Sequence, residues 1–172
     1  MSKIAQRLKQ LNITLPKFQE AVGTYRKCIR EGNLVYTSTH FGMCDEGKTV
    51  AGKVTTQDKI ERDRANAKRD GYEINFVTQE DATVLARNAG LRLLSTLKHS
   101  IGDLDKVEQV VKLVGIVNGV ADFNKHGAVI NGCSNVLVEV LGEEVGKGVR
   151  VCTGSGSLAA AVTCDIVVRV RD

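Results

Sequence analysis

Residues 78–118, TQEDATVLARNAGLRLLSTLKHSIGDLDKVEQVVKLVGIVN, contain the clearest structural signal in this chain. Thr78 followed by Asp81 resembles a capping box, which is typical of the start of a helix. Apolar residues then recur at steps of three and four, which predicts a long amphipathic helix ending near Gly102. The β-branched run over residues 107–118 predicts a buried, central strand. The apolar face of the helix consists of Ala82, Leu85, Ala86, Ala89, Leu93, Leu97 and Ile101.

On the amino-terminal side of this stretch the pattern changes to alternation. AVGTYRKCIR (21–30) and NLVYTSTH (33–40) flank a turn at Gly32 and Asn33, two residue types that tolerate positive φ. This pattern predicts that the domain opens with a β-hairpin. Residues 48–55, KTVAGKVT, predict a third short strand, although the glycine in its middle weakens the signal.

The carboxyl-terminal side predicts one more helix and two more strands. Apolar residues at helical spacing between residues 129 and 141 predict the helix, and Gly142 stands where a C-cap glycine belongs. Residues 149–155 and 162–170 predict the last two strands. The order β-β-(β)-α-β-α-β-β predicts an α+β fold, a mixed sheet with two long helices packed on one face.

Both faces of this sheet carry apolar side chains. Ile166 and Val168 point one way while Val167 points the other, and VVKLVGIV (110–117) is apolar on both sides. A sheet of this kind cannot leave one face in water. We therefore expect a homo-oligomer that closes sheet against sheet.

Two segments lie outside this pattern. Residues 57–73, QDKIERDRANAKRDGYE, mix charges and contain few apolar residues, which predicts a solvated insertion, partly helical or mobile. At the amino terminus, Ile4 and Leu8 at helical spacing predict an amphipathic helix, with an organelle-targeting signal as the alternative. We expect an amino-terminal extension, 1–20, followed by one domain, 21–172, that contains the insertion.

Composition limits the function classes. A chain of 172 residues with 42% hydrophobic residues suits one well-cored domain. The net charge is +4, and the basic residues are interleaved with acidic ones, so nucleic acid is not an expected partner. Five widely spaced cysteines without a C-x-x-C pair argue against a metal site and suit a reducing, cytoplasmic location. No apolar run approaches the ~18 residues needed to span a membrane, so we expect no membrane association.

Four blocks of the chain, in order and at matching spacing, resemble the YjgF/RidA/L-PSP family over about residues 20–170. The stretch FNKHGAVINGCSNVLVEVLG (123–142) is similar to the longer subfamily. The resemblance implies a chorismate-mutase-like α+β fold and a homotrimer. The blocks are VGTY (22–25), GNLVYTS (32–38), IGDLDKVEQVVKLVGIVNGVADF (101–123) and VRVC…GSL…CDI (149–166).

The resemblance also implies a site and a reaction. An arginine at the position of Arg150 grips a substrate carboxylate, and the backbone near Cys152 contacts the substrate. A glutamate at the position of Asp165 positions the attacking water, while residues corresponding to Tyr25 and Ser38 line the same cleft between neighbouring subunits. The implied reaction is hydrolysis of reactive 2-imino or enamine acids to 2-keto acids and ammonia, without metal or cofactor.

The residue types suit this chemistry on their own terms. A planar guanidinium holds a planar carboxylate through two parallel hydrogen bonds, which fixes the adjacent C=N carbon. A neighbouring carboxylate that accepts a proton from water contributes roughly 100- to 10,000-fold to such a rate.

The sequence departs from the family pattern at four places. Asp165 is one methylene shorter than the family's glutamate, which weakens the positioning of water. Leu158–Ala159 replaces a Leu-Pro pair, Ser38–Thr39 replaces a Ser-Gly pair, and Val149 replaces a small residue. These departures keep open a second function, a catalytically silent trimer that binds a small carboxylate ligand or a protein partner. A third, ribonuclease activity, finds little support in the charge distribution.

Each candidate residue also has an ordinary alternative. Arg150 is otherwise an edge-strand arginine in a surface pair, and Asp165 is a solvated acid. Tyr25 and Ser38 are otherwise an aromatic residue and a hydroxyl of a hairpin. Cys152 is a wall residue of the core or cleft, and a reactive thiol there would require an electropositive setting, which Arg150 could supply.

Overall fold

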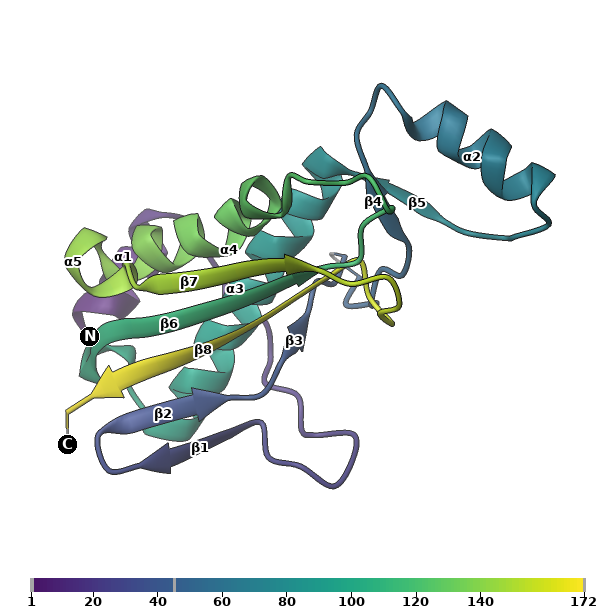
Figure 1. Ribbon diagram of the computed structural model, residues 1–172. Helices are drawn as coiled ribbons and strands as arrows, with labels where there is room; N and C mark the ends of the chain where they lie inside the picture. The colour runs from purple at the N-terminus through teal and green to yellow at the C-terminus, as the bar shows by residue number, and fades with distance from the viewer. Residues whose placement is uncertain (1, 45, 172) are drawn as a thin grey trace.

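The computed structural model describes residues 2–44 and 46–171 and has a mixed sheet of six strands. The strand order is β1-β2-β8-β6-β7, and β3 pairs with β8 after β2 ends (Figure 1). Within this sheet β6 and β7 pair in parallel and the other pairs are antiparallel, so the predicted mixed sheet is confirmed. The strands are β1 (Cys28–Glu31), β2 (Leu34–Thr37), β3 (His40–Phe41), β6 (Val107–Val117), β7 (Val149–Gly154) and β8 (Val162–Val170).

The two long helices pack side by side on one face of this sheet, as predicted (Figure 1). They are α3 (Gln79–Ile101) and α4 (His126–Leu141). Leu97 of α3, Leu137 of α4 and Ile166 of β8 are almost fully buried between the helices and the sheet. Burying each such side chain stabilises the fold by about 1.5–3 kcal/mol. The core therefore lies in one layer between helices and sheet.

The limits of α3 are those that the sequence predicts. The Thr78 hydroxyl accepts a hydrogen bond from the amide of Asp81 at 3.0 Å, which caps the first turn. Gly102 ends the helix with a φ of 83°, a conformation that favours glycine. The strand predicted at 107–118 is β6, an interior strand, although β8 takes the middle place in the sheet.

The amino-terminal helix, α1 (Lys3–Gln10), packs on the body of the protein. Ile4 and Leu8 are buried in the core. Asp105 belongs to the short helix η1 (Leu104–Lys106). The Asp105 carboxylate accepts hydrogen bonds from the amides of Lys3 and Ile4, both at 2.7 Å. The amphipathic pattern of this segment thus reflects packing. A further short helix, α5 (Glu143–Gly146), follows α4 directly.

The hairpin prediction was correct in place but too long. The turn lies at Gly32, whose φ is 60°, but β1 begins at Cys28 and residues 21–27 form a loop. The partner strand β2 ends at Thr37, whose hydroxyl donates to the carbonyl and accepts from the amide of Ile166 (3.1 and 2.9 Å). The Ser38 amide still donates to the Lys27 carbonyl at 2.8 Å, but the chain then runs on as β3 and pairs only with β8, so residues 21–26 have no strand opposite them.

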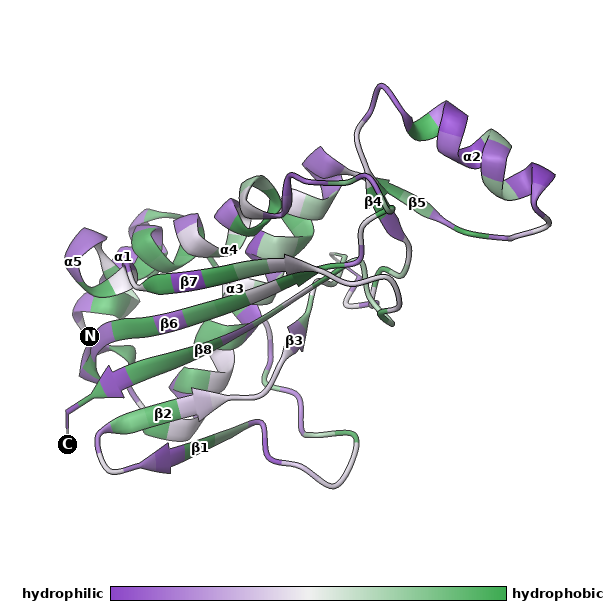
Figure 2. Ribbon diagram, in the orientation of Figure 1, coloured by the Kyte–Doolittle hydropathy of each residue, from purple (hydrophilic) through white to green (hydrophobic). Residues whose placement is uncertain are grey.

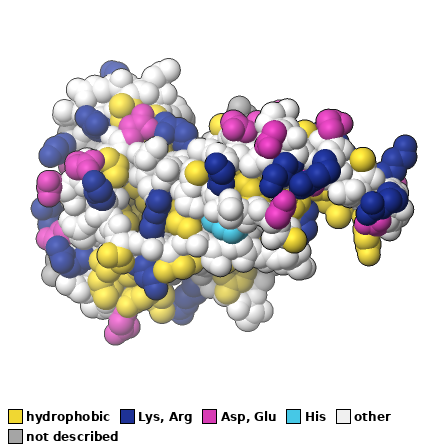
Figure 3. Space-filling view, turned by 45° about the horizontal axis from the view of Figure 1, so that its top comes forward, with side chains coloured by type: hydrophobic (Ala, Val, Ile, Leu, Met, Phe, Trp, Pro, Cys, Tyr) yellow, Lys and Arg dark blue, Asp and Glu magenta, His cyan; other side chains and the backbone are white. Residues whose placement is uncertain are grey.

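Residues 48–55 contain a strand, but it does not join the main sheet. β4 (Lys53–Thr55) pairs in parallel with β5 (Phe76–Thr78) in a separate two-stranded sheet. Residues 56–75 between them, here called the arm, carry α2 (Ile60–Arg69) away from the body (Figure 1). The helix of the arm is largely hydrophilic (Figure 2), and basic and acidic side chains lie close together on the arm (Figure 3).

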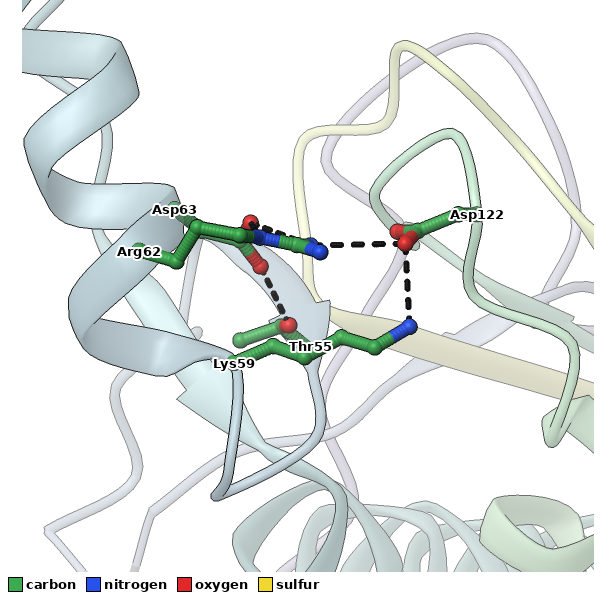
Figure 4. Close-up of polar contacts among 5 residues, drawn as sticks. All are labelled: Thr55, Lys59, Arg62, Asp63 and Asp122. Carbon is green, nitrogen blue, oxygen red and sulfur yellow. Dashed lines mark hydrogen bonds and ion pairs between the residues drawn. The ribbon is translucent and has the colours of Figure 1, made fainter.

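A charged network ties the arm to the body (Figure 4). Asp63 of α2 is only 8% exposed and accepts hydrogen bonds from Thr55 (2.5 Å) and Arg62 (2.7 Å). Asp122, which lies between β6 and α4, pairs with Lys59 (2.9 Å) and Arg62 (3.3 Å). Arg62 therefore bridges a carboxylate of the arm and one of the body.

The face of the sheet opposite α3 and α4 is uncovered and apolar. Strand register places four apolar residues and one lysine in a row across it, and Val149 is 70% exposed. The row is Ile29, Tyr36, Val167, Lys112 and Val149. We call this the open face. Within the described residues, no helix is long and apolar enough to cross a membrane.

Candidate functional site

Arg150 lies on β7, the edge strand of the sheet, and points towards the helices. It pairs in register with Leu113, which is buried under the helix layer, so the two side chains share that face. Its Nη1 donates hydrogen bonds to Asn131 Oδ1 at 2.7 Å and Ser134 Oγ at 3.1 Å, both on α4. The guanidinium is thus held by neutral side chains.

No carboxylate of the described chain is paired with Arg150. The two nearest acids of the adjoining cavity are engaged elsewhere, Glu139 by Arg87 and Glu143 by Lys147, each at 2.6 Å. The Nε and Nη2 atoms of Arg150 have no hydrogen-bond partner among the described residues. Two parallel N–H groups and a full positive charge are therefore available to a carboxylate.

A cavity of about 540 Å³ adjoins Arg150, within the size range of small-molecule sites. The strands contribute Val110 and Leu113 to its wall, and α4 contributes Leu137 and Val138. The cavity therefore has a cationic end and an apolar wall.

Asp165 lies on the open face. It pairs in register with Val114, which also pairs with Val151 of β7. Asp165 is half-buried, and this burial raises the pKa of its carboxyl, while the charge of Lys112 and a hydrogen bond from Thr39 act in the opposite direction. A raised pKa makes the carboxylate a stronger base than a solvated aspartate.

One chain places Arg150 and Asp165 on opposite faces of the sheet. The β6 residues opposite them, Leu113 and Val114, are consecutive, and successive side chains of a strand point to opposite faces. A site that contains both side chains would therefore draw them from two copies of the chain. A shared site remains a prediction.

Cys152 pairs with Gly115 and is half-buried on the helix side. Burial raises the pKa of its thiol, and the charge of Arg150 only partly opposes this effect. This favours the wall role over the reactive-thiol alternative. Within residues 2–44 and 46–171, no group of three His, Cys, Asp or Glu side chains could hold a metal ion.

Tyr25 and Ser38 lie far from Arg150 within one chain. Tyr25 is in the 21–27 loop, is 46% exposed, and has the Lys27 amine 5.6 Å from its ring centroid. Ser38 follows β2, and its buried hydroxyl has no partner among the described residues. β8 and β6 separate β2 from β7, a distance of about 14 Å at ~4.8 Å per strand.

Sequence reasoning missed the side chains that surround the two charges. Asn131 and Ser134 are three residues apart in a largely apolar helix, and this polar pair was a usable signal. Thr39 and Lys112 had no such signal, because their proximity to Asp165 depends on strand pairing.

No model of a known protein family matches the sequence. Protein TCP17 of Trypanosoma cruzi is 27% identical over 172 residues, covering 99% of this chain and 96% of that protein. Among solved structures, Atu1372 of Agrobacterium tumefaciens, a protein of unknown function, is 32% identical. The match covers 98% of this chain and 94% of Atu1372, with a TM-score of 0.76.

An endoribonuclease candidate from Shewanella oneidensis shares the fold with a TM-score of 0.80. It is 20% identical and covers 98% of this chain and all of its own. The 32% identity over nearly the whole chain relates this protein to Atu1372, and the TM-score of 0.80 shows that it has the fold of the Shewanella protein, in line with the resemblance of its four sequence blocks to the YjgF/RidA/L-PSP family.

Proposed function

We propose that the protein hydrolyses reactive 2-imino or enamine acids to 2-keto acids and ammonia, with Arg150 binding the substrate carboxylate. The observation that carries the proposal is the state of Arg150. Its guanidinium is held by two neutral side chains, has no acidic partner among the described residues, and adjoins a cavity of about 540 Å³.

The chemistry follows from the two charged side chains. Arg150 donates two N–H groups to the carboxylate and fixes the neighbouring C=N carbon. Water adds to that carbon, and Asp165 accepts a proton from the water and passes it to the nitrogen. The hydroxyl proton of the resulting carbinolamine then reaches the nitrogen, the C–N bond breaks, ammonia leaves and the C=O bond forms.

A second copy of the chain supplies Asp165 in this proposal. The open face carries both Asp165 and exposed apolar residues, and Arg150 lies on the edge strand β7, so we propose that association through the open face buries apolar surface and places Asp165 of one copy against the β7 edge of the next. We propose a homotrimer, the assembly implied by the resemblance.

A ligand of the right class is known for this fold. E. coli TdcF was solved with bound serine, a small molecule with a carboxylate. It shares the fold at 13% identity and a TM-score of 0.53, covering 91% of this chain and 94% of its own.

The second candidate function is a silent carboxylate binder. Arg150 is oriented by contacts within one chain, whereas Asp165 lies on the other face and is shorter than the family's glutamate. We do not propose a ribonuclease, the activity in the name of the Shewanella relative, because each arginine of the arm is paired with an acid.

The rate of keto-acid release from freshly generated 2-iminobutyrate tests the proposal. We expect acceleration by the wild type and a loss of about 10- to 100-fold or more with Arg150→Ala, which removes a charge-assisted contact. Asp165→Ala should abolish turnover but retain binding of 2-ketobutyrate. If only Asp165→Glu is active, the protein is the silent binder; if Arg150→Ala matches the wild type in rate and binding, the proposal is wrong.

A further inference from the structure

We infer that Asn131 and Ser134 of α4 are positioning residues for Arg150, which hold its guanidinium in place and leave its charge for a ligand carboxylate. The inference rests on the proposed role of Arg150 in carboxylate binding. It adds two residues that neither the sequence blocks nor the comparisons single out.

The geometry of the two contacts leaves the useful edge of the guanidinium free. Asn131 Oδ1 and Ser134 Oγ both accept from the same nitrogen, Nη1, because residues three apart are neighbours on a helix surface. Nε and Nη2, the pair that forms a fork for a carboxylate, keep their hydrogens free. The residue of α4 beside Nη2 is Gly127, which has no side chain. A Cβ built there would lie 3.7 Å from that nitrogen.

The neutrality of both partners matters as much as their position. A carboxylate in place of Asn131 would form an ion pair with Arg150 and compete with the ligand for its charge. The two acids that line the same cavity, Glu139 and Glu143, are already engaged by Arg87 and Lys147. The surroundings thus orient Arg150 without neutralising it.

Orientation also lowers the entropic cost of binding. Arg150 is on an exposed edge strand, and a free arginine side chain samples many rotamers that a ligand would have to restrict. Two hydrogen bonds that Arg150 donates to α4 restrict these rotamers beforehand. We expect this to strengthen carboxylate binding by about 10-fold.

The test is calorimetric titration of 2-ketobutyrate into the full chain. Asn131→Ala with Ser134→Ala should weaken binding about 10-fold, and Ser134→Thr, which keeps the hydroxyl, should restore the contribution of Ser134. Asn131→Asp should weaken binding at least as much, yet unfold at the same or a higher temperature, because it creates an ion pair. A purely structural role would instead move affinity and thermal stability together.

The matched control is Asn124→Ala, which removes an exposed asparagine just before the same helix that neither hydrogen-bonds to Arg150 nor lines its cavity. It should bind as the wild type does. If Arg150→Ala abolishes binding but Asn131→Asp and the double variant bind normally, the positioning inference alone is overturned. If the wild type does not bind 2-ketobutyrate, or Arg150→Ala binds equally well, the carboxylate role of Arg150 fails and the inference fails with it. Should the double variant unfold, the single variant Ser134→Ala gives the same comparison.

Discussion

His40 is a buried histidine, 2% exposed, at the start of β3, and its ring contacts α3. Its Nδ1 donates to the carbonyl of Ser38 at 2.8 Å, so Nε2 is the nitrogen that accepts from the Thr96 hydroxyl at 2.7 Å. Burial lowers the pKa of this imidazole from 6.5 to about 4. The folded protein therefore keeps His40 neutral at pH values where the unfolded chain binds a proton.

This difference predicts acid destabilisation in a defined window. Below pH 6.5 the unfolded state takes up a proton that the folded state refuses until about pH 4, so stability falls as pH falls. The loss should reach about 3 kcal/mol, at 1.36 kcal/mol per pKa unit. Urea denaturation at pH 7 and pH 4.5 measures it, with His40→Gln as the comparison. An equal pH dependence in both proteins would contradict the assignment.

For Asp165 we expect a pH dependence of stability with the opposite sign. Because burial raises its folded pKa above 3.8, its ionised form costs stability once the pH exceeds the folded pKa, and the cost is absent below 3.8. Asp165→Asn should therefore be more stable than the wild type at pH 7, with no gain near pH 3. Urea midpoints at the two pH values check this, and a destabilised variant at pH 7 would refute it. A residue kept at a cost to stability fits a functional role.

At the scale of the elements, the close packing of α3 against α4 depends on a glycine. A Cβ at Gly132 of α4 would lie 2.0 Å from the backbone oxygen of Thr83 on α3, well inside van der Waals contact. The helices approach closely because residue 132 has no side chain. This backbone contact sets the distance between α3 and α4.

Gly132→Ala should therefore destabilise the fold by about 1–3 kcal/mol or more, since the helices must separate to admit the methyl group. Gly127→Ala is the matched control on the same helix, because its Cβ meets nothing nearer than 3.7 Å. That change should be neutral or stabilising by up to ~1 kcal/mol through helix propensity. Thermal or urea unfolding of both variants compares them, and equal stability would show that the helices yield at no cost.

At the scale of the whole molecule, the uncovered apolar sheet face calls for a partner surface. Val149 and Val151 of β7 are 70% and 47% exposed, and β1, β2 and β8 add Ile29, Tyr36 and Val167 to the same face. Contiguous apolar surface of this kind marks an association site. We propose that copies of the chain supply the cover.

Val151→Asp should then weaken self-association by more than about 10-fold, because it places an unpaired charge in the apolar contact. Sedimentation velocity over a concentration series measures this. Val84→Asp, at an exposed position of α3 away from the open face, should leave association unchanged. A wild type that stays monomeric at high micromolar concentration would contradict the proposal.

Much of the fold was predictable because its signals are local. The Thr78 cap and the Gly102 terminus bound α3, and each involves residues within about four positions of one another. Alternation, by contrast, predicted a strand over residues 21–27 that does not form. Whether those residues pair depends on the opposite strand, which ends when the Thr37 hydroxyl binds the backbone of Ile166.

Residue types and spacing were enough to identify the helices, most strands, the resemblance to a family, and Arg150 and Asp165 as the charges of interest. The relation between these two charges was decided by folding. Arg150 faces α4 and Asp165 the open face because β7 and β8 pair with consecutive residues of β6, Leu113 and Val114. A shift of one residue would exchange the faces, and strand register arises from contacts between distant segments that spacing along one strand does not encode.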